Sequence, residues 1–281
     1  MQITKMQGIG NSYVLIEDLD RKLEKKYPKI AKAISDKSFG IGSDGILVVN
    51  KGKKAKFWMR VINPDGSEAE MCGNGIRIFA RYLYDKKLIG KESDIEVGGS
   101  RGGRIVKPRI NDDGTITVDM GKGKVLEKKV IVADGKKFSG ICVSVGNPHF
   151  VIFTKSEKEA KENAANYGSA IENHSAFSNK TNVEFAFVKT SDEIIVHVWE
   201  RGAGLTLACG TGASATAFAA LKGGRTKNKT RIILPGGELA IEVKNDDTVM
   251  MSGPAEYIFS STIDIDKLLS DSYVVGNSRT S

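Results

Sequence analysis

Residues 71–83 read MCGNGIRIFARYL, and residues 208–221 read ACGTGASATAFAAL. In both stretches a cysteine precedes Gly-x-Gly and then a run typical of a helix, and the two cysteines are 137 residues apart (209 − 72). Three further pairs of segments keep an offset of 136 to 138: GNSYVLIED at 10–18 with GNPHFVIFT at 146–154, DGILVV at 44–49 with NVEFAF at 182–187, and MRVIN at 59–63 with VHVWE at 196–200. Such a constant offset indicates two similarly built halves.

Short runs rich in Val and Ile, bounded by Gly, Asp or Asn, predict strands in both halves. Helices are expected at 22–35, after each cysteine, and at 157–171. We therefore predict an α+β fold with two structurally similar strand-rich domains from an internal duplication, each with a central helix, and an active site in the cleft between them. The predicted domains are 1–118 and 119–261, joined near the turn-prone stretch 113–125, with a tail at 262–281 that could pack back on the first.

The chain has 281 residues, of which 40% are hydrophobic, and a formal charge of +8. Its lysines are mixed with glutamates, as in KSEKEAKEN at 155–163, and its densest basic run, 51–56, has no interleaved aromatic side chain. Nucleic acid is therefore not an expected partner, whereas an acidic substrate would suit the charge. No stretch approaches about 18 consecutive apolar residues, and the first residues do not read as a secretory leader. We expect a cytoplasmic protein without a membrane partner.

The three cysteines are too few for a disulfide framework and lack the paired spacing of a zinc site. Cys142 lies in the apolar run ICVSV and is expected to be structural. Cys72 and Cys209 each stand at the predicted start of a helix, where unpaired N–H groups and the helix dipole stabilise a thiolate. The same N–H groups, at Gly73, Asn74, Gly210 and Thr211, could hold a carboxylate.

Two thiols related by a duplication predict one reactive group on each side of a bound substrate. Inverting a stereocentre without an electron-sink cofactor needs a base on one face and an acid on the other, and a thiolate and a thiol can exchange these roles. This pattern favours a cofactor-independent amino-acid epimerase. A single Cys-Gly-x-Gly would instead be read as a buried cysteine in a tight turn.

The sequence closely resembles the diaminopimelate epimerase family along its whole length. The matching stretches are KMQGIGNSYVLIED at 5–18, FGIGSDGILVV at 39–49, NPDGSEAEMCGNGIRIFARY at 63–82, GNPHFVIF at 146–153, KTNVEF at 180–185, WERGAGLTLACGTGA at 199–213 and GPAEYIF at 253–259. The resemblance implies interconversion of LL- and meso-2,6-diaminopimelate in lysine and cell-wall precursor biosynthesis, with no cofactor and no metal. It is compatible with a homodimer.

The resemblance also implies roles for individual residues. Cys72 and Cys209 match the two proton-transfer cysteines, and His149 and Glu200 match residues that tune the cysteine pKa values. The residues that match substrate contacts are Asn11, Asn63, Gly73, Asn74, Asn147, Asn182, Glu200, Arg201, Gly210 and Thr211. Asn, Arg and Glu suit a substrate with an ammonium and a carboxylate at each end.

The sequence departs from the common family pattern at a few places. Leu205 replaces a usual Glu, Ser12 and Tyr13 replace Asp-Phe, and Gln7 replaces His. Two other functions stay open from the residues alone. One is a racemase for another amino acid, and the other is a binding or redox protein in which the two cysteines form a switchable disulfide.

Overall fold

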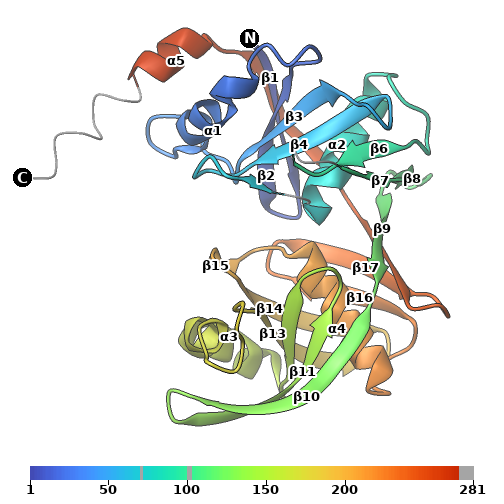
Figure 1. The fold of residues 1–281 in the computed structure, drawn as a ribbon. Coiled ribbons are helices and arrows are strands. Elements are labelled where there is room, and N and C mark those ends of the chain that lie inside the picture. The colour runs from blue at the N-terminus through green and yellow to red at the C-terminus, as the bar shows by residue number, and fades with distance from the viewer. Residues whose placement is uncertain (70–71, 100–102, 272–281) are drawn as a thin grey trace, which may run out of the picture. The chain divides into compact units, whose positions relative to one another are not determined.

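The computed structural model describes residues 1–69, 72–99 and 103–271, and these form two compact units (Figure 1). Unit 1 comprises Met1–Ile116 and Pro254–Ser281, and unit 2 comprises Thr117–Gly253. Unit 2 thus begins near the predicted residue 119 but ends before the predicted residue 261. The reason is that strand β19 (Glu256–Thr262) returns to pair antiparallel with β1 (Gln2–Gly8).

Unit 1 is built on a mixed sheet with the strand order β19-β1-β2-β3-β4-β6-β7, and β5 pairs with β4. Its remaining strands are β2 (Asn11–Glu17), β3 (Ile46–Lys51), β4 (Phe57–Ile62), β5 (Glu68–Ala69), β6 (Ile95–Val97) and β7 (Arg104–Val106). Its helices are the 3-10 turn η1 (Glu24–Lys26), α1 (Tyr27–Ser35), α2 (Gly73–Asp85) and α5 (Ile265–Asp271).

The second sheet has the order β10-β11-β12-β13-β14-β16-β17-β18-β9-β8, and β15 pairs with β14. Its strands are β8 (Arg109–Ile110), β9 (Ile116–Lys122), β10 (Lys124–Ala133), β11 (Lys136–Ser144), β12 (Pro148–Phe153), β13 (Asn182–Thr190), β14 (Glu193–Glu200), β15 (Gly204–Thr206), β16 (Lys229–Leu234), β17 (Gly237–Val243) and β18 (Thr248–Gly253). Two helices belong to unit 2, α3 (Glu157–Glu172) and α4 (Gly210–Lys222).

The two sheets repeat one connectivity. In unit 1, β2 pairs parallel with β3, and β4 pairs parallel with β6. In unit 2, β12 pairs parallel with β13, and β14 pairs parallel with β16. Helices α1 and α3 connect the first parallel pair of each unit, and α2 and α4 lead to the second. The predicted α+β fold with two similar halves is confirmed.

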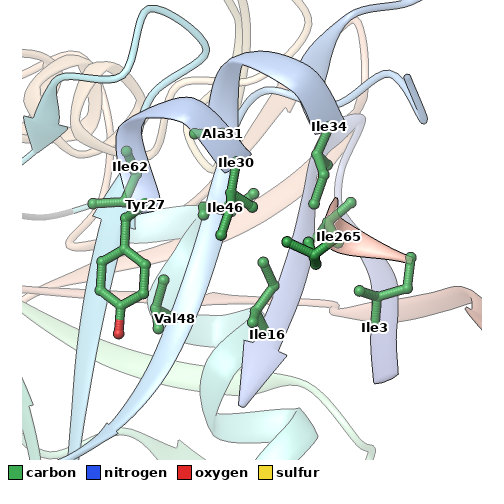
Figure 2. Close-up of a cluster of buried hydrophobic side chains, with 11 residues drawn as sticks. Ile3, Ile16, Tyr27, Ile30, Ala31, Ile34, Ile46, Val48, Ile62 and Ile265 are labelled. Carbon is green, nitrogen blue, oxygen red and sulfur yellow. The ribbon is translucent and has the colours of Figure 1, made fainter. Parts of the chain in front are cut away.

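Alternation along β3 places the helices of unit 1 on opposite faces of its sheet, because successive side chains of a strand point to opposite sides. Ile46 and Val48 lie in a buried cluster with Ile30 and Ile34 of α1, as Figure 2 shows. Leu47 points the other way, and its Cδ2 lies 3.2 Å from the position that a Cβ on Gly75 of α2 would take.

Strand β13 repeats this alternation with one chemical change. Val183 and Phe185 belong to a buried cluster with side chains of α3, including Ala164. Between them Glu184 faces the start of α4, where its Oε1 lies 2.8 Å from a Cβ built on Gly212. A carboxylate therefore occupies the place that an aliphatic side chain holds in unit 1.

The helix predicted at 22–35 begins as an α-helix only at Tyr27. The carboxylate of Asp18 accepts hydrogen bonds from the backbone N–H groups of Lys22 and Leu23, at 2.9 and 2.8 Å, which holds the chain in a turn before η1. The predicted tail is in part helical, since α5 places Ile265 in the buried cluster beneath α1. Residues 272–281 of that tail lie outside the described part.

Candidate active site

Cys72 is the N-cap residue of α2. Its backbone is extended, with φ −134° and ψ 118°, and its sulfur accepts a hydrogen bond from the N–H of Gly75 at 3.3 Å. The sequence folds in this way because Gly75 has no Cβ: one built there would lie 3.2 Å from the Cβ of Cys72. The cysteine side chain thus takes the role that Ser or Asp plays at most helix starts.

Cys209 caps α4 in the same manner. Its φ is −127° and its ψ is 108°, and its sulfur accepts from the N–H of Gly212 at 3.3 Å. A Cβ on Gly212 would lie 3.2 Å from that sulfur. Both cysteines therefore stand at helix N-termini, as the sequence predicts, with the sulfur directed at the first free N–H groups.

The sulfur of Cys72 is surrounded by polar groups from β2 and α2. The hydroxyl of Tyr13 lies 3.3 Å from Sγ, and Oδ1 of Asn11 lies at 3.8 Å. The same Oδ1 accepts from the amide of Asn74 at 3.3 Å. The amide of Asn11 donates in turn to Asp44 at 2.8 Å. Unit 1 therefore brings three predicted site residues together, namely Asn11, Cys72 and Asn74.

Arg77 lies beneath this group as a fully buried side chain of α2. Its Nη1 donates to Oδ1 of Asn74 at 3.0 Å, and its Nε donates to the carbonyl of Pro254 at 3.2 Å. Burial lowers the pKa of Arg77 to about 10, and the nearby Cys72 opposes that shift. The guanidinium therefore stays charged near neutral pH.

The surroundings of Cys209 are acidic instead. Burial raises the pKa of the Cys209 thiol well above its usual value, and the carboxylates of Glu200 and Glu184 raise it further. Hydrogen bonds with Thr211 and Gly212 act in the opposite direction and are outweighed. The helix start alone predicted a lowered pKa, and burial beside two carboxylates reverses that expectation for this thiol.

Glu200 and Thr211 lie next to Cys209. The Thr211 hydroxyl is 3.5 Å from its sulfur, and the Thr206 hydroxyl donates to Oε1 of Glu200 at 2.5 Å. Burial raises the pKa of Glu200, while hydrogen bonds from Thr206 and Cys209 lower it in part. The amide of Asn147 donates to Oγ1 of Thr211 at 3.3 Å, so this predicted site residue joins the same group.

His149 links Asn147 to Glu184. Its Nδ1 lies 2.7 Å from Oε1 of Glu184, and its Nε2 lies 2.9 Å from Oδ1 of Asn147. The side chains of His149 and Glu184 are both completely buried. Oε2 of Glu184 is also buried and has no hydrogen-bond partner in the described part of the chain.

Asn182 and Arg201 meet through the backbone. Oδ1 of Asn182 accepts from the N–H of Arg201 at 3.0 Å, and its amide donates to the carbonyl of Pro148 at 2.9 Å. The guanidinium of Arg201 is exposed and donates to the carbonyl of Asn179 at 3.1 Å. Asn63 lies in unit 1 just after β4, where its amide donates to the Ser67 hydroxyl at 3.0 Å.

A surface cavity of about 530 Å³ lies in unit 2 beside these residues. Asn147, His149 and Arg201 line it, together with Lys180 and Thr181. Its size falls in the range of small-molecule sites. Cys209 is not among its lining residues, so the cavity borders the Asn147 and Arg201 side of the group and not the sulfur itself.

Comparison with known proteins decides the family. The diaminopimelate epimerase family model matches residues 3–126 and 141–258. The chain belongs to the diaminopimelate epimerase family. The diaminopimelate epimerase of Desulfitobacterium hafniense is 40% identical over 280 residues, covering 94% of this chain and 98% of that protein. That of Carboxydothermus hydrogenoformans is 42% identical, covering 92% and 98%. The predicted resemblance is confirmed.

Solved structures show how widely this epimerase fold is shared. A phenazine biosynthesis protein of the PhzF family from Bacillus anthracis has a TM-score of 0.71 at 14% identity, covering 94% of this chain and 99% of its own. A hydroxyproline epimerase from Agrobacterium vitis, with bound trans-4-hydroxy-L-proline, has a TM-score of 0.66 at 13% identity, covering 93% and 91%. These likenesses concern the fold.

Within residues 1–69, 72–99 and 103–271, no helix is both long and apolar enough to cross a bilayer. In the same part of the chain, the His, Cys, Asp and Glu side chains form no group of three that could hold a metal ion.

Sequence reasoning did not single out three residues that the epimerase structure places at the thiols. The sequence patterns place Glu184 in a strand and Arg77 in a helix, and they mark Tyr13 only as a departure from the expected family pattern. The sequence repeat aligns Arg77 with Ser214 at the offset of 137, which was an available signal. The segment offset of 138 set Glu184 opposite Ile46, and only the parallel-strand register makes Glu184 the equivalent of Leu47, at an offset of 137. A charged residue that replaces an apolar or small one in a buried strand or helix is rarely without a partner.

Proposed function

We propose that this chain interconverts LL- and meso-2,6-diaminopimelate by a two-base mechanism in which Cys72 and Cys209 act on opposite faces of one α-carbon. The family supports the reaction. The observation that carries the mechanism is the matched position of the two thiols, since each is the N-cap of its helix and accepts one N–H at 3.3 Å. Two reactive sulfurs held in the same way in two repeated units suit a reaction that runs in both directions.

The proton balance of the proposed step is simple. One cysteine, as thiolate, takes the α-proton and becomes a thiol. The other, as thiol, gives its proton to the opposite face and becomes a thiolate. The carbanion formed between the two events is stabilised by delocalisation into the α-carboxylate, which the N–H groups at Gly73, Asn74, Gly210 and Thr211 would hold.

The distal end of the substrate carries its own ammonium and carboxylate. We assign their recognition to Asn63, Asn182, Glu200 and Arg201, with Asn11 and Asn147 at the reacting end. Arg201 is exposed at the cavity of unit 2, where its guanidinium can grip a carboxylate. Asn182 fixes the backbone of Arg201 through the bond at 3.0 Å, so it serves to position that contact.

The reaction can be tested with meso-diaminopimelate in D2O under reducing conditions. The LL product should carry one α-deuterium at the inverted centre, and at low conversion the recovered meso isomer should remain unlabelled. This pattern follows because the incoming proton comes from the second thiol, which exchanges with solvent. Absence of both exchange and epimerisation in the reduced enzyme would refute the proposed reaction.

Variants separate the roles of the three thiols. Cys72→Ala and Cys209→Ala should each lower epimerisation by at least about a thousandfold, because each removes one of the two proton-transfer groups. Cys142→Ala is the matched control, since this buried thiol lies in β11 and belongs to the hydrophobic cluster of unit 2. It should retain the rate of the parent enzyme. Full activity of Cys72→Ala would contradict the two-base scheme.

A racemase for a smaller amino acid would use the same thiols. Such a substrate would offer no second carboxylate to the exposed guanidinium of Arg201, whereas Asn63 and Asn182 would keep their hydrogen bonds within the chain. Side-by-side deuterium exchange with diaminopimelate and single amino acids decides between the two. A disulfide switch is the other alternative, and full turnover in the presence of reductant would dismiss it.

The compartment and the assembly complete the proposal. Three thiols outside any disulfide suit a reducing compartment, so we assign the enzyme to the cytoplasm. A homodimer is the assembly that we propose, and sedimentation equilibrium over a range of protein concentrations measures it. A single species with the mass of one chain, 30.4 kDa, would refute the dimer.

A further inference from the structure

The repeat offers an internal comparison of the two thiol surroundings. At offsets of 136 and 137, three pairs of equivalent residues differ in charge or polarity, namely Tyr13 with His149, Leu47 with Glu184, and Arg77 with Ser214. Each pair lies beside its cysteine or in the first turns of the helix that the cysteine caps. The duplication therefore preserved the positions of the sulfurs and changed what surrounds them.

The charged and polar groups on the Cys72 side favour an anion. Arg77 is a buried cation of the same helix, and the Tyr13 hydroxyl can donate to the sulfur at 3.3 Å. Asp44, which accepts from the amide of Asn11, is an acidic group on this side; it is exposed, so water screens its charge. Glu70 lies outside the described residues.

The groups on the Cys209 side favour a neutral thiol. Glu184 and Glu200 provide two carboxyl groups, and His149 is the titratable base that pairs with the first. Ser214, at the place of Arg77, brings no charge: it is buried, and its hydroxyl donates to the carbonyl of Gly210 at 2.8 Å. The surroundings of Cys209 thus contain two acidic groups and one imidazole, and this cysteine is only 4% exposed.

We propose that the substrate-free enzyme rests in one polarity, with the negative charge on Cys72 and the exchangeable proton on Cys209, and that Arg77 and Glu184 set this polarity. Arg77 acts as a positioning residue in a second way. Its bond to Oδ1 of Asn74 turns the amide of that side chain toward Asn11, which lies beside the sulfur. Glu184 acts on Cys209 through its own negative charge and through the imidazole of His149, which it contacts.

This inference rests on the proposed two-base function and adds a direction to it. In the resting enzyme Cys72 is ready to accept a proton and Cys209 is ready to donate one. A turnover leaves the opposite arrangement, with the thiol at Cys72 and the thiolate at Cys209. The enzyme must then exchange both protons with solvent before it can act again on the same isomer.

The polarity can be measured without substrate. Short pulses of iodoacetamide at a series of pH values, followed by peptide mass spectrometry, give the labelling midpoint of each cysteine in the intact enzyme. The midpoint is independent of how accessible the sulfur is, whereas the absolute rate is not. We expect the midpoint of Cys72 to lie at least about one pH unit below that of Cys209. Thiolate absorbance near 240 nm in a protein with Cys72→Ser and Cys142→Ser gives the Cys209 midpoint if labelling there is slow.

Substitutions at two residues, Glu184 and Arg77, test which residues set the polarity. Glu184→Gln should lower the Cys209 midpoint by about one unit and leave the Cys72 midpoint in place. Arg77→Gln should raise the Cys72 midpoint, whereas Arg77→Lys, which keeps the charge, should raise it less. The matched control is Glu96→Gln, which removes a buried carboxylate of unit 1 that accepts from the backbone N–H groups of Lys53 and Lys54. It should move neither midpoint.

Equal midpoints within about 0.3 unit, or a lower midpoint for Cys209, would overturn the proposal. An unchanged Cys209 midpoint in Glu184→Gln would overturn the part assigned to that residue, and this variant decides the matter even if Arg77→Gln does not fold. Because no diaminopimelate is used, the two proposals fail separately. An enzyme that epimerises fully with equal midpoints refutes only the polarity, and unequal midpoints in an enzyme inactive on diaminopimelate refute only the reaction.

Discussion

The hydroxyl of Tyr13 lies 3.3 Å from the sulfur of Cys72, at one of the positions where the sequence departs from the expected family pattern. Tyr13 is buried, so the contact is shielded from bulk water. Its equivalent in the second unit, His149, reaches Glu184 and not a sulfur. The tyrosine hydroxyl therefore contacts Cys72, whereas the hydroxyl beside the Cys209 sulfur is that of Thr211, at 3.5 Å.

Tyr13→Phe should shift the pH profile of epimerisation. A hydroxyl that donates to a thiolate favours the charged form, so removing it raises the pKa of the sulfur, and the thiolate then forms at higher pH. We expect the acidic limb of the profile to move upward by about 0.5–1 unit, with a roughly threefold to tenfold loss at neutral pH. Tyr82→Phe is the control, because that hydroxyl donates to Glu17 at 2.7 Å. A Tyr13→Phe profile identical to that of the parent enzyme would speak against the contact.

Gly212→Ala should lower catalysis, because the added methyl group crowds the start of α4. The added methyl would lie 2.8 Å from Oε1 of Glu184 and 3.2 Å from the sulfur of Cys209, so at least one of them must move. We expect a loss in kcat/KM of about a hundredfold, since a displacement of about 1 Å in an active site has this order of effect. Gly90→Ala is the control, because its Cβ would meet its nearest atom at 4.0 Å. Full activity of Gly212→Ala would show that the tight packing at this helix start does not matter.

Glu172→Gln should loosen the turn that carries Arg201. The carboxylate of Glu172 accepts from the indole of Trp199 at 2.8 Å and from the N–H of Gly202 at 3.0 Å. Losing these charged hydrogen bonds should lower the unfolding free energy at pH 7 by about 1–3 kcal/mol, measured in urea. It should also raise KM more than it lowers kcat, because Arg201 is a proposed substrate contact. An unchanged KM would show that this turn does not affect substrate binding.

The same carboxyl gives a stability prediction with a defined sign. Burial raises the pKa of Glu172, but hydrogen bonds from Trp199 and Gly202 and the charge of Lys180 lower it more, so it lies below its ordinary value of 4.5. A group with a depressed pKa in the folded state adds stability above its unfolded pKa, and this is lost as the pH falls through the folded value. Below pH 4.5 the parent enzyme should therefore lose stability more steeply than Glu172→Gln. Urea unfolding of both proteins at a series of pH values checks this. The same pH dependence of the unfolding free energy in the two proteins would contradict it.

Leu205→Glu introduces the residue that the expected family pattern has at this position. Leu205 lies in β15 with 53% of its surface exposed, so the change should alter the unfolding free energy by no more than about 0.5 kcal/mol. We expect kcat/KM to change less than about threefold. Differential scanning calorimetry and the epimerisation assay check both expectations. A large gain in activity would mean that the leucine limits this enzyme.

The thiol geometry was predictable because it depends on local chemistry. A cysteine before Gly-x-Gly and a helical run leaves the sulfur at the N-cap, and the repeat required the same arrangement at Cys72 and Cys209. The return of β19 to β1 was not predictable in this way. Gln2 pairs with Thr262, and no local pattern records a partner 260 residues away along the chain.

The acidic character of the Cys209 surroundings was also missed. A glutamate inside NVEFAF looks like a polar residue on the exposed face of a half-buried strand. In the structure both faces of β13 are covered, by α3 and by α4, so Glu184 is fully buried. Strand alternation indicates which side a residue faces, but not whether a helix covers that side.

Sulfur at the two N-caps leads to a trade-off between stability and activity at the same two atoms. Serine, aspartate and asparagine are better helix caps than cysteine, by an amount within the roughly 0.5–2 kcal/mol that separates good caps from poor ones. A library screened only for thermal resistance would therefore select replacements at Cys72 and Cys209 that are sturdier and inactive. The N-cap of each of these helices is less stabilising than another residue would make it, and the reactivity of the enzyme depends on that choice of residue.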